Sequence, residues 1–391
     1  MNQKPRNIAQ LSMVLVYLFD CGEIVCPAFS RIFKVLKYGG FAVAFAGCGI
    51  CLLYRVLERR KLKYSAEIKM FFVVFLYFVI VSLCKIFQEE KFTYKTIEEL
   101  VQLALPFIFA FIILNYLSLG QIMNAMRICL AVSFISYLIT KRNELLVLGN
   151  WFNMSFGSSY SAFESSDFAE MASGLSAFFI YYRKKCPVAA VISAVFVIMT
   201  FKRILILQLI MLILISLFSL SDKRVSNMII NASIVIVTAV TYCYQYLLQR
   251  ENAAVFTNLF KADIGSFTMG RVYRLWYPLS GYVSYGFGST TAELGNCLEM
   301  DLIKIVMEVG LIGLVLFIWC YFKVAGNKFY SYAVMGAMFV NLLFASGLTS
   351  TVGWISRITA LAAISCYGSG SAECAGKRRR RRLVYNARRI L

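Results

Sequence analysis

The stretch PVAAVISAVFVIMTFKRILILQLIMLILISLFSL at residues 187–220 decides the fold class of this chain. Its strongly polar side chains are Lys202, Arg203 and Gln208, and after Pro187 it has no glycine or proline to make a turn. Two helices that meet at Lys202 and Arg203 would each have about 14–17 residues, near the lower limit for crossing a hydrocarbon core of about 30 Å. The stretch therefore predicts two short membrane helices.

The composition of the whole chain agrees with this interpretation. Of the 391 residues, 60% are hydrophobic and 15% are charged, and the mean hydropathy is +0.71. Soluble domains are about 45–50% apolar. Apolar runs of the length that a membrane helix needs, roughly 20 residues, recur along the chain, whereas strands of a β-barrel would be shorter and would alternate. We predict an all-α integral membrane protein that forms a single domain over residues 1–391.

Twelve transmembrane helices are expected from these apolar runs, and an even number places both termini on the same side of the membrane. The predicted helices fall at 9–27, 35–54, 68–87, 100–118, 121–139, 168–182, 187–201, 204–220, 226–245, 302–322, 329–347 and 352–368. The first one is predicted to stay in place as a helix, because no small-residue cleavage site follows its apolar run.

The basic residues predict the orientation. With cytoplasmic termini, the inner segments carry 23 Lys and Arg against 4 Asp and Glu, and the outer segments carry 16 of each, while Arg127 lies inside a helix. Because Lys and Arg favour the cytoplasmic side, both termini are expected there, in a plasma membrane. The net charge of +20 therefore indicates no nucleic-acid partner. The basic tail at 369–391 is expected to attract anionic membrane lipid.

Two larger loops, at 140–167 and 245–301, are left on the outer side. Any external function has to reside mainly there, because the other loops are short. The chain has no histidine, which excludes imidazole catalysis and histidine-ligated metals, and most of its 12 cysteines fall inside apolar runs, where cysteine behaves as a small hydrophobe. We therefore expect no metal site and no cofactor.

Two pairs of basic residues are candidates for binding an anion on the outer side. Lys202 and Arg203 are predicted at or below the outer surface, where a buried charge costs about 2.5–3.5 kcal/mol. The alternative is that both side chains snorkel to headgroups. Arg271 and Arg274 are spaced to share one helix face in the second outer loop. Arginine suits phosphate, because its planar fork meets two oxygens at once.

Aromatic side chains surround the second pair and suggest a flat, sugar-like ligand. They are Tyr273, Trp276, Tyr277, Tyr282, Tyr285 and Phe287. Aromatic residues at this depth also serve as anchors at the membrane interface, which is the alternative interpretation.

Several short motifs now follow one another in a fixed order. They are Lys202-Arg203, Gly270-Arg271, Trp276, GFG at 286–288, Asn296 and EVGLIG at 308–313. This order resembles the superfamily of polysaccharide polymerases and O-antigen ligases (Wzy-type and related proteins). Its members carry a basic residue at the outer start of a helix, then a long external loop, and then a helix of the form Glu-x-Gly-Leu-Ile-Gly. FESSDFA at 163–169 is also similar to the family's passage from loop to helix.

The resemblance implies a GT-C-like architecture and a glycosyltransferase-type reaction at the bacterial inner membrane. A growing chain on undecaprenyl diphosphate would be transferred to the end sugar of another lipid-linked repeat, giving O-antigen or capsule. The resemblance also implies a partner protein that regulates the length of the polysaccharide chain. The ligase branch commonly has a histidine before the Asn, where this chain has Gly295, so the resemblance points to a polymerase.

The candidate site residues follow from the residues and the resemblance together. Diphosphate binding is assigned to Arg203, Lys202, Arg271 and Arg274, sugar binding to Trp276, Tyr277, Tyr282 and Asn296, and catalysis to Glu308, Asp301 and Glu164. Glu308 lies inside an apolar helix, and a structural ion pair with Lys304, four residues before it, is the alternative to a catalytic role. The glycines of GLIG are expected to allow close helix packing.

Two other functions remain open. One is an O-antigen ligase or another lipid-linked glycosyl transferase. The other is a flippase for the same lipid-linked oligosaccharides, since twelve helices also suit a transporter. Transporters tend to have internal repeats and broken helices at the midplane, whereas the unusual polar residues here gather on the outer side.

Overall fold

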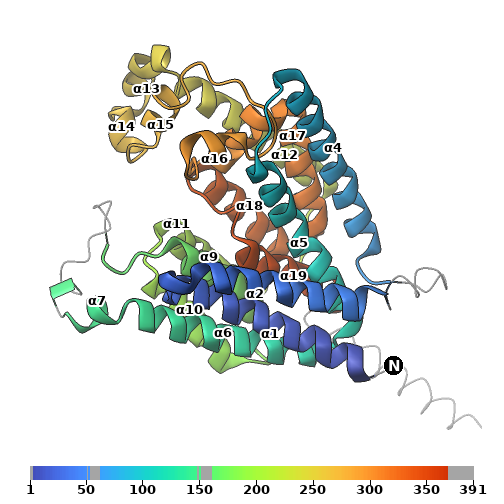
Figure 1. Cartoon of the computed structure of the whole chain (residues 1–391). Helices are drawn as coiled ribbons and strands as arrows, with labels where there is room; N and C mark the ends of the chain where they lie inside the picture. Colours follow the sequence, from blue (N-terminus) through green and yellow to red (C-terminus); the bar gives the residue numbers. More distant parts are fainter. Residues whose placement is uncertain (1–2, 51, 53–61, 148, 151–160, 369–391) are drawn as a thin grey trace, which may run out of the picture.

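A computed structural model describes the chain except for residues 1–2, 51, 53–61, 148, 151–160 and 369–391. The described part is all α-helical, with 17 α-helices and no strand. The tail expected at 369–391, the last residues of the helix predicted at 35–54 and the middle of the first outer loop lie outside the described residues. Figure 1 shows a bundle of long helices with a group of short helices at one end.

Each of the twelve predicted ranges overlaps one helix of 13 residues or more. These are α1 (Gln3–Val25), α2 (Ser30–Ala44), α4 (Ser65–Glu89), α5 (Tyr94–Tyr116), α6 (Leu119–Thr140), α9 (Ser166–Tyr181), α10 (Pro187–Met199), α11 (Arg203–Leu217), α12 (Asn227–Leu247), α17 (Asp301–Ala325), α18 (Phe329–Phe344) and α19 (Thr351–Tyr367). A short π-helix, η2 (Phe45–Gly49), continues α2. Seven helices are long and apolar enough to cross a membrane, namely α1, α2 with η2, α4, α5, α6, α12 and α17. The chain is therefore a multi-pass membrane protein.

The two ends of the bundle differ in what they carry. The terminal end holds the N-terminus and the last turn of α19, where the Tyr367 hydroxyl donates to Leu117 O at 3.0 Å and Lys328 Nζ donates to Ile364 O at 2.9 Å. The loop end holds α7 (Arg142–Leu146) and the short helices α13 (Ala253–Phe260), α14 (Ile264–Phe267), α15 (Val272–Trp276) and α16 (Ser289–Leu294). The described parts of both predicted outer loops thus lie at the end opposite to the N-terminus.

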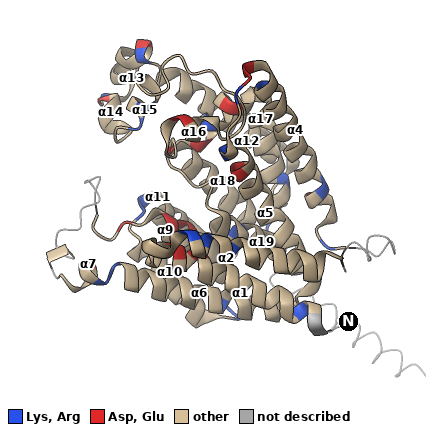
Figure 2. Ribbon diagram, in the orientation of Figure 1, with Lys and Arg blue, Asp and Glu red and all other residues tan. Residues whose placement is uncertain are grey.

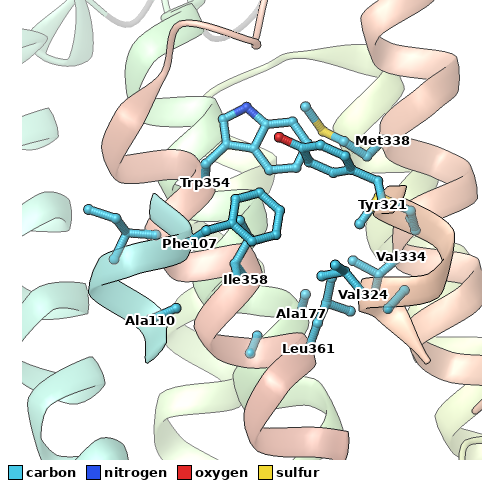
Figure 3. Close-up of a cluster of buried hydrophobic side chains, with 14 of the residues drawn as sticks. Phe107, Ala110, Ala177, Tyr321, Val324, Val334, Met338, Trp354, Ile358 and Leu361 are labelled. Carbon is cyan, nitrogen blue, oxygen red and sulfur yellow. The ribbon is translucent and has the colours of Figure 1, made fainter. Parts of the chain in front are cut away.

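The centre of the bundle is formed by α9 and α19, whose residues are almost all buried. These two helices can carry polar side chains because their neighbours separate them from lipid. They approach closely at Gly174, where an added Cβ would lie 2.0 Å from Ser356 Oγ, so a glycine is required. Beside them, Tyr321 of α17 packs edge-on against Phe107 and Trp354 (Figure 3).

The helix α17 is broken in its middle, at the motif EVGLIG. Gly310 has φ 79° and ψ 176°, a conformation that is essentially restricted to glycine. An added Cβ at Gly310 would meet no atom within 4 Å, so the expectation of close packing is wrong for this glycine. At Gly313 an added Cβ would lie 3.3 Å from the ring of Tyr77, so close packing is confirmed there.

Candidate functional site

Arg271 and Arg274 meet at one carboxylate, as their spacing predicts. Arg271 Nε donates to Glu299 Oε2 at 2.8 Å, and Arg274 Nη1 lies 3.2 Å from Glu299 Oε1. The same Nη1 also donates to the Cys297 carbonyl at 2.5 Å. The two arginine side chains are 23% and 33% exposed, and that of Glu299 is 33% exposed. We call this group the Glu299 cluster; it bears two positive charges and one negative charge, and water reaches all three members.

The charge balance of the Glu299 cluster also governs its titration. Partial burial alone raises the pKa of the Glu299 carboxyl, but the hydrogen bonds and charges of Arg271 and Arg274 lower it, and the net shift is downward. The carboxylate is therefore ionised at neutral pH, and the cluster keeps a net charge of about +1.

An open pocket lies between the short helices of the loop end. It has a volume of about 390 Å³, and its wall includes Tyr273 and Trp276 together with the polar residues Asn258 and Asp263. The two rings are T-shaped with centroids 5.6 Å apart, and the indole N–H of Trp276 donates to Leu248 O at 2.7 Å. This pocket, which we call the aromatic pocket, offers a fixed ring face beside a carboxylate and an amide, which is a composition that suits a hydroxylated ring.

The other residues predicted to bind sugar do not line this pocket. Tyr277 is 63% exposed and contacts Arg250 across its ring face at 6.0 Å. The Tyr282 hydroxyl is hydrogen-bonded to Ser289, and Asn296 Oδ1 accepts the next backbone N–H, that of Cys297, at 2.8 Å. Of the four residues predicted to bind sugar, Trp276 is the one that lines the aromatic pocket.

Lys202 lies in a different group, at the centre of the bundle. Its Nζ is 2.8 Å from Glu170 Oε1, and Arg357 pairs with the other oxygen of the same carboxylate. Asn341 Nδ2 also donates to Glu170, at 2.9 Å. The exposed fractions are 7% for Lys202, 2% for Glu170 and 1% for Arg357. We call this group the Glu170 cluster; its three charged side chains are almost completely buried.

Lys202 is buried inside the bundle rather than at its surface. Snorkelling to headgroups is wrong for this side chain, because its amine points to Glu170 in the interior. Arg203, the first residue of α11, is partly exposed beside it. Figure 2 shows charged residues gathered around α9 and around α16, while most of the outward faces of α4 and α6 are uncharged. Lys202 is therefore placed apart from Arg271 and Arg274.

Two of the three carboxylates predicted to be catalytic hold backbone in place. Glu308 is fully buried; its oxygens accept the Gly288 and Thr290 N–H groups at 2.9 Å and the Thr290 hydroxyl at 2.5 Å. Asp301 accepts the N–H groups of Gly347 and Leu348 at 2.6 and 2.7 Å. These hydrogen bonds fix both carboxylates against backbone N–H groups and so give each a structural partner.

Glu164 has a different environment, since it is exposed at the start of α9. The prediction of an ion pair between Lys304 and Glu308 is also wrong, because Lys304 pairs with a different carboxylate. Lys304 Nζ pairs with Glu99 of α5 and donates to Thr291 Oγ1 at 2.8 Å. Glu308 therefore has a structural role through the loop backbone rather than through Lys304.

A polar cavity of about 480 Å³ lies where α1, α2, α5, α9 and α19 meet at the loop end. Lys37 bridges Asp20 and Glu23 of α1, at 2.7 Å to each. Asp167 also lines the cavity; it is exposed, and no hydrogen bond or ion pair engages its carboxylate among the described residues. We call this space the outer cavity.

The sequence analysis did not identify the charged residues of α1 and α2 that line the outer cavity. Asp20 and Glu23 are spaced by three at the end of the first helix, and Lys34 and Lys37 are spaced by three near the start of the second. This complementary spacing could have indicated one charged face between the two helices. For Glu170 and Arg357 no such signal exists, because 187 residues separate the partners.

Comparisons with known proteins add no relative. No family model matches the chain, and neither the characterised proteins nor the solved structures include a match. Among the described residues, no group of three or more Cys, Asp or Glu side chains could hold a metal ion.

Proposed function

We propose that this protein is a glycosyltransferase-type polymerase that joins oligosaccharide repeats carried on undecaprenyl diphosphate into a surface polysaccharide. The reaction takes place on the outer side of a bacterial plasma membrane, with both termini in the cytoplasm. The motif order from Lys202 to Gly313 motivates the proposal, through its resemblance to the Wzy-type superfamily. The position of both larger loops at one end of the bundle supports a single outer site.

The Glu299 cluster is the observation that carries the proposal. Each guanidinium has five N–H donors, and the two together use only a few of them on Glu299 and Cys297. A diphosphate can therefore join or replace the carboxylate and form charge-assisted hydrogen bonds with Arg271 and Arg274. These bonds stabilise the negative charge that develops on a departing diphosphate.

The rest of the reaction needs little from the protein beyond orientation and a proton acceptor. The acceptor hydroxyl oxygen bonds to the anomeric carbon while the bond from that carbon to the phosphate oxygen breaks. The lipid diphosphate leaves, and the hydroxyl proton passes to a carboxylate. Glu164 and Asp167 suit this step better than Glu308 or Asp301, because both are exposed near the start of α9. The aromatic pocket suits a sugar ring stacked on Trp276.

Chain extension by the purified protein tests the proposal. With lipid-linked repeats as the only substrate and no ion gradient, the wild type is expected to give a ladder of longer chains. Arg271→Ala and Arg274→Ala are expected to slow extension by about 10²–10³-fold, the loss typical of an electrostatic contact to a transition state. Lys261→Ala is the matched control, because Lys261 is an exposed basic residue in the same loop.

Three outcomes separate the competing functions. Transfer of repeats only to a separate acceptor lipid would assign the chain to the ligases. Movement of lipid-linked repeats across a vesicle membrane without extension would assign it to the flippases. Extension at the wild-type rate by both arginine variants would contradict the role of the Glu299 cluster while leaving the polymerase activity in place.

A further inference from the structure

A groove with basic residues at one end lies between α6 and the start of α10. Its volume is about 310 Å³, and Arg127 and Lys185 line it together with the apolar residues Leu130, Val188 and Ile192. Arg127 is the basic residue that the charge pattern left without a side of the membrane. The groove thus combines two cations with an apolar wall.

The two cations are not neutralised by the protein. Arg127 donates to Asn124 Oδ1 at 3.3 Å and lies 2.9 Å from Cys186 Sγ, both uncharged partners. Lys185 Nζ lies over the ring of Tyr182, 5.9 Å from the ring centroid. No carboxylate pairs with either cation in the part of the chain that the structure describes. A guanidinium inside a membrane helix is costly unless an opposite charge meets it.

The walls beyond the groove are apolar and open. Val188, Val191 and Ile198 of α10 are 70%, 64% and 51% exposed, and Ile128 and Ile135 of α6 are 43% and 55% exposed. In a membrane protein such faces contact acyl chains. A molecule with its anionic group at Arg127 can therefore extend its hydrocarbon along α6 and α10, which a free phosphate cannot do.

We propose that this groove binds one anionic phospholipid, with the phosphate between Arg127 and Lys185 and an acyl chain along Leu130, Ala131 and Ile192. The groove lies toward the terminal end, because Tyr182 donates to Ala363 O near the end of α19. With cytoplasmic termini, this is the inner leaflet, whose basic pockets between helices hold anionic headgroups. The lipid fills the groove between α6 and α10 and is separate from the proposed polymerase site.

Lipid retention tests this inference without reference to activity. The purified full-length protein is incubated with mixed micelles of equal parts phosphatidylglycerol and phosphatidylethanolamine, and bound lipid is identified by native mass spectrometry. The wild type is expected to retain one phosphatidylglycerol. Arg127→Ala and Lys185→Ala are each expected to weaken this binding about fivefold, the effect of removing one basic residue next to an anionic lipid.

Lys184→Ala is the matched control, because Lys184 is an exposed neighbour of the same charge that does not line the groove. Ala131→Phe fills the apolar part of the groove and keeps both cations, and it is expected to lower retention as well. A gel-filtration profile like that of the wild type shows that each variant is folded.

Three results would overturn the inference. The first is equal retention of phosphatidylglycerol by Arg127→Ala and Lys184→Ala. The second is retention of phosphatidylethanolamine by the wild type in place of the anionic lipid. The third is displacement of the bound lipid by inorganic phosphate in the micelle solution, which would assign the groove to a free anion.

Discussion

Glu170 and Glu299 each accept two cationic side chains, but one group is sealed inside the bundle and the other is open to water. In the Glu170 cluster the carboxylate pairs with Lys202 and Arg357, and these residues are at most 7% exposed. In the Glu299 cluster the carboxylate pairs with Arg271 and Arg274, and the three side chains are 23–33% exposed. The charges are the same, so exposure decides whether a cluster can exchange its carboxylate for a ligand.

This difference in exposure gives the buried cluster a structural role and the exposed cluster a binding role. Removing one partner of a buried ion pair leaves an uncompensated charge, so such a pair is held permanently. An exposed pair is worth little to stability and can be replaced by another anion at small cost. We therefore regard the Glu170 cluster as the fixed centre of α9, α11 and α19, and the Glu299 cluster as the place where a phosphate can bind.

The largest expected effect is on stability, and it distinguishes the two carboxylates directly. Glu170→Ala leaves two buried cations without a counter-charge and is expected to lower the free energy of unfolding by about 3–5 kcal/mol. Glu299→Ala is expected to change it by about 1 kcal/mol or less. Unfolding in detergent, followed by circular dichroism, measures both. Equal losses for the two variants would remove the distinction.

A smaller effect is expected where the second outer loop is fastened to the bundle. Gly288 has φ +87°, and an added Cβ would lie 2.8 Å from the Lys95 carbonyl. Gly288→Ala is therefore expected to cost about 1–3 kcal/mol of backbone strain and to loosen the loop that Glu308 holds.

Hydrogen exchange of the backbone amides is the measurement for this variant. Faster exchange is expected in α15 and α16, with α9 unchanged, because the Glu170 cluster does not depend on the loop. Gly281→Ala is a suitable comparison, since Gly281 also has positive φ but an added Cβ there would meet no atom within 4 Å. Acceleration in α9 by the Gly288 variant would show that the two clusters are coupled.

The smallest effect is a dependence on pH that belongs to the open cluster alone. Arg271 and Arg274 lower the pKa of Glu299, so its ion pairs stabilise the loop fully above the ordinary pKa of about 4.3. That contribution is lost as the pH falls through the lowered value. Exchange in α15 is expected to quicken over this acidic range in the wild type but not in Glu299→Gln. The same transition in the Glu299→Gln variant would assign it to another group.

The sequence predicted the helices well because their signals are local. Each apolar run and the polar residues that end it are close together in sequence, so all twelve ranges overlap observed helices. Arg271 and Arg274 could also be predicted to act together, since three residues separate them. Their shared partner Glu299 could not, because the turns between α15 and Glu299 are set by contacts across the loop.

The partners of the buried charges were beyond sequence reasoning for the same reason. The apolar surroundings of Lys202 indicate that a charge there needs a partner, but Glu170 and Arg357 reach it only when α9, α11 and α19 pack together. Glu308 was identified as unusual because a carboxylate is costly in an apolar helix. Its partners are backbone N–H groups of the loop, and every residue type except proline carries such a group, so the sequence does not indicate which ones Glu308 contacts.

Binding of undecaprenyl diphosphate by the purified protein tests the central claim most directly. If the Glu299 cluster holds the diphosphate, Arg271→Ala is expected to weaken binding at least about tenfold, the loss of one charge-assisted hydrogen bond of about 1.5–3 kcal/mol. Lys202→Met, in the fraction that remains folded, is expected to bind like the wild type. Loss of binding by Lys202→Met together with unchanged binding by Arg271→Ala would contradict it.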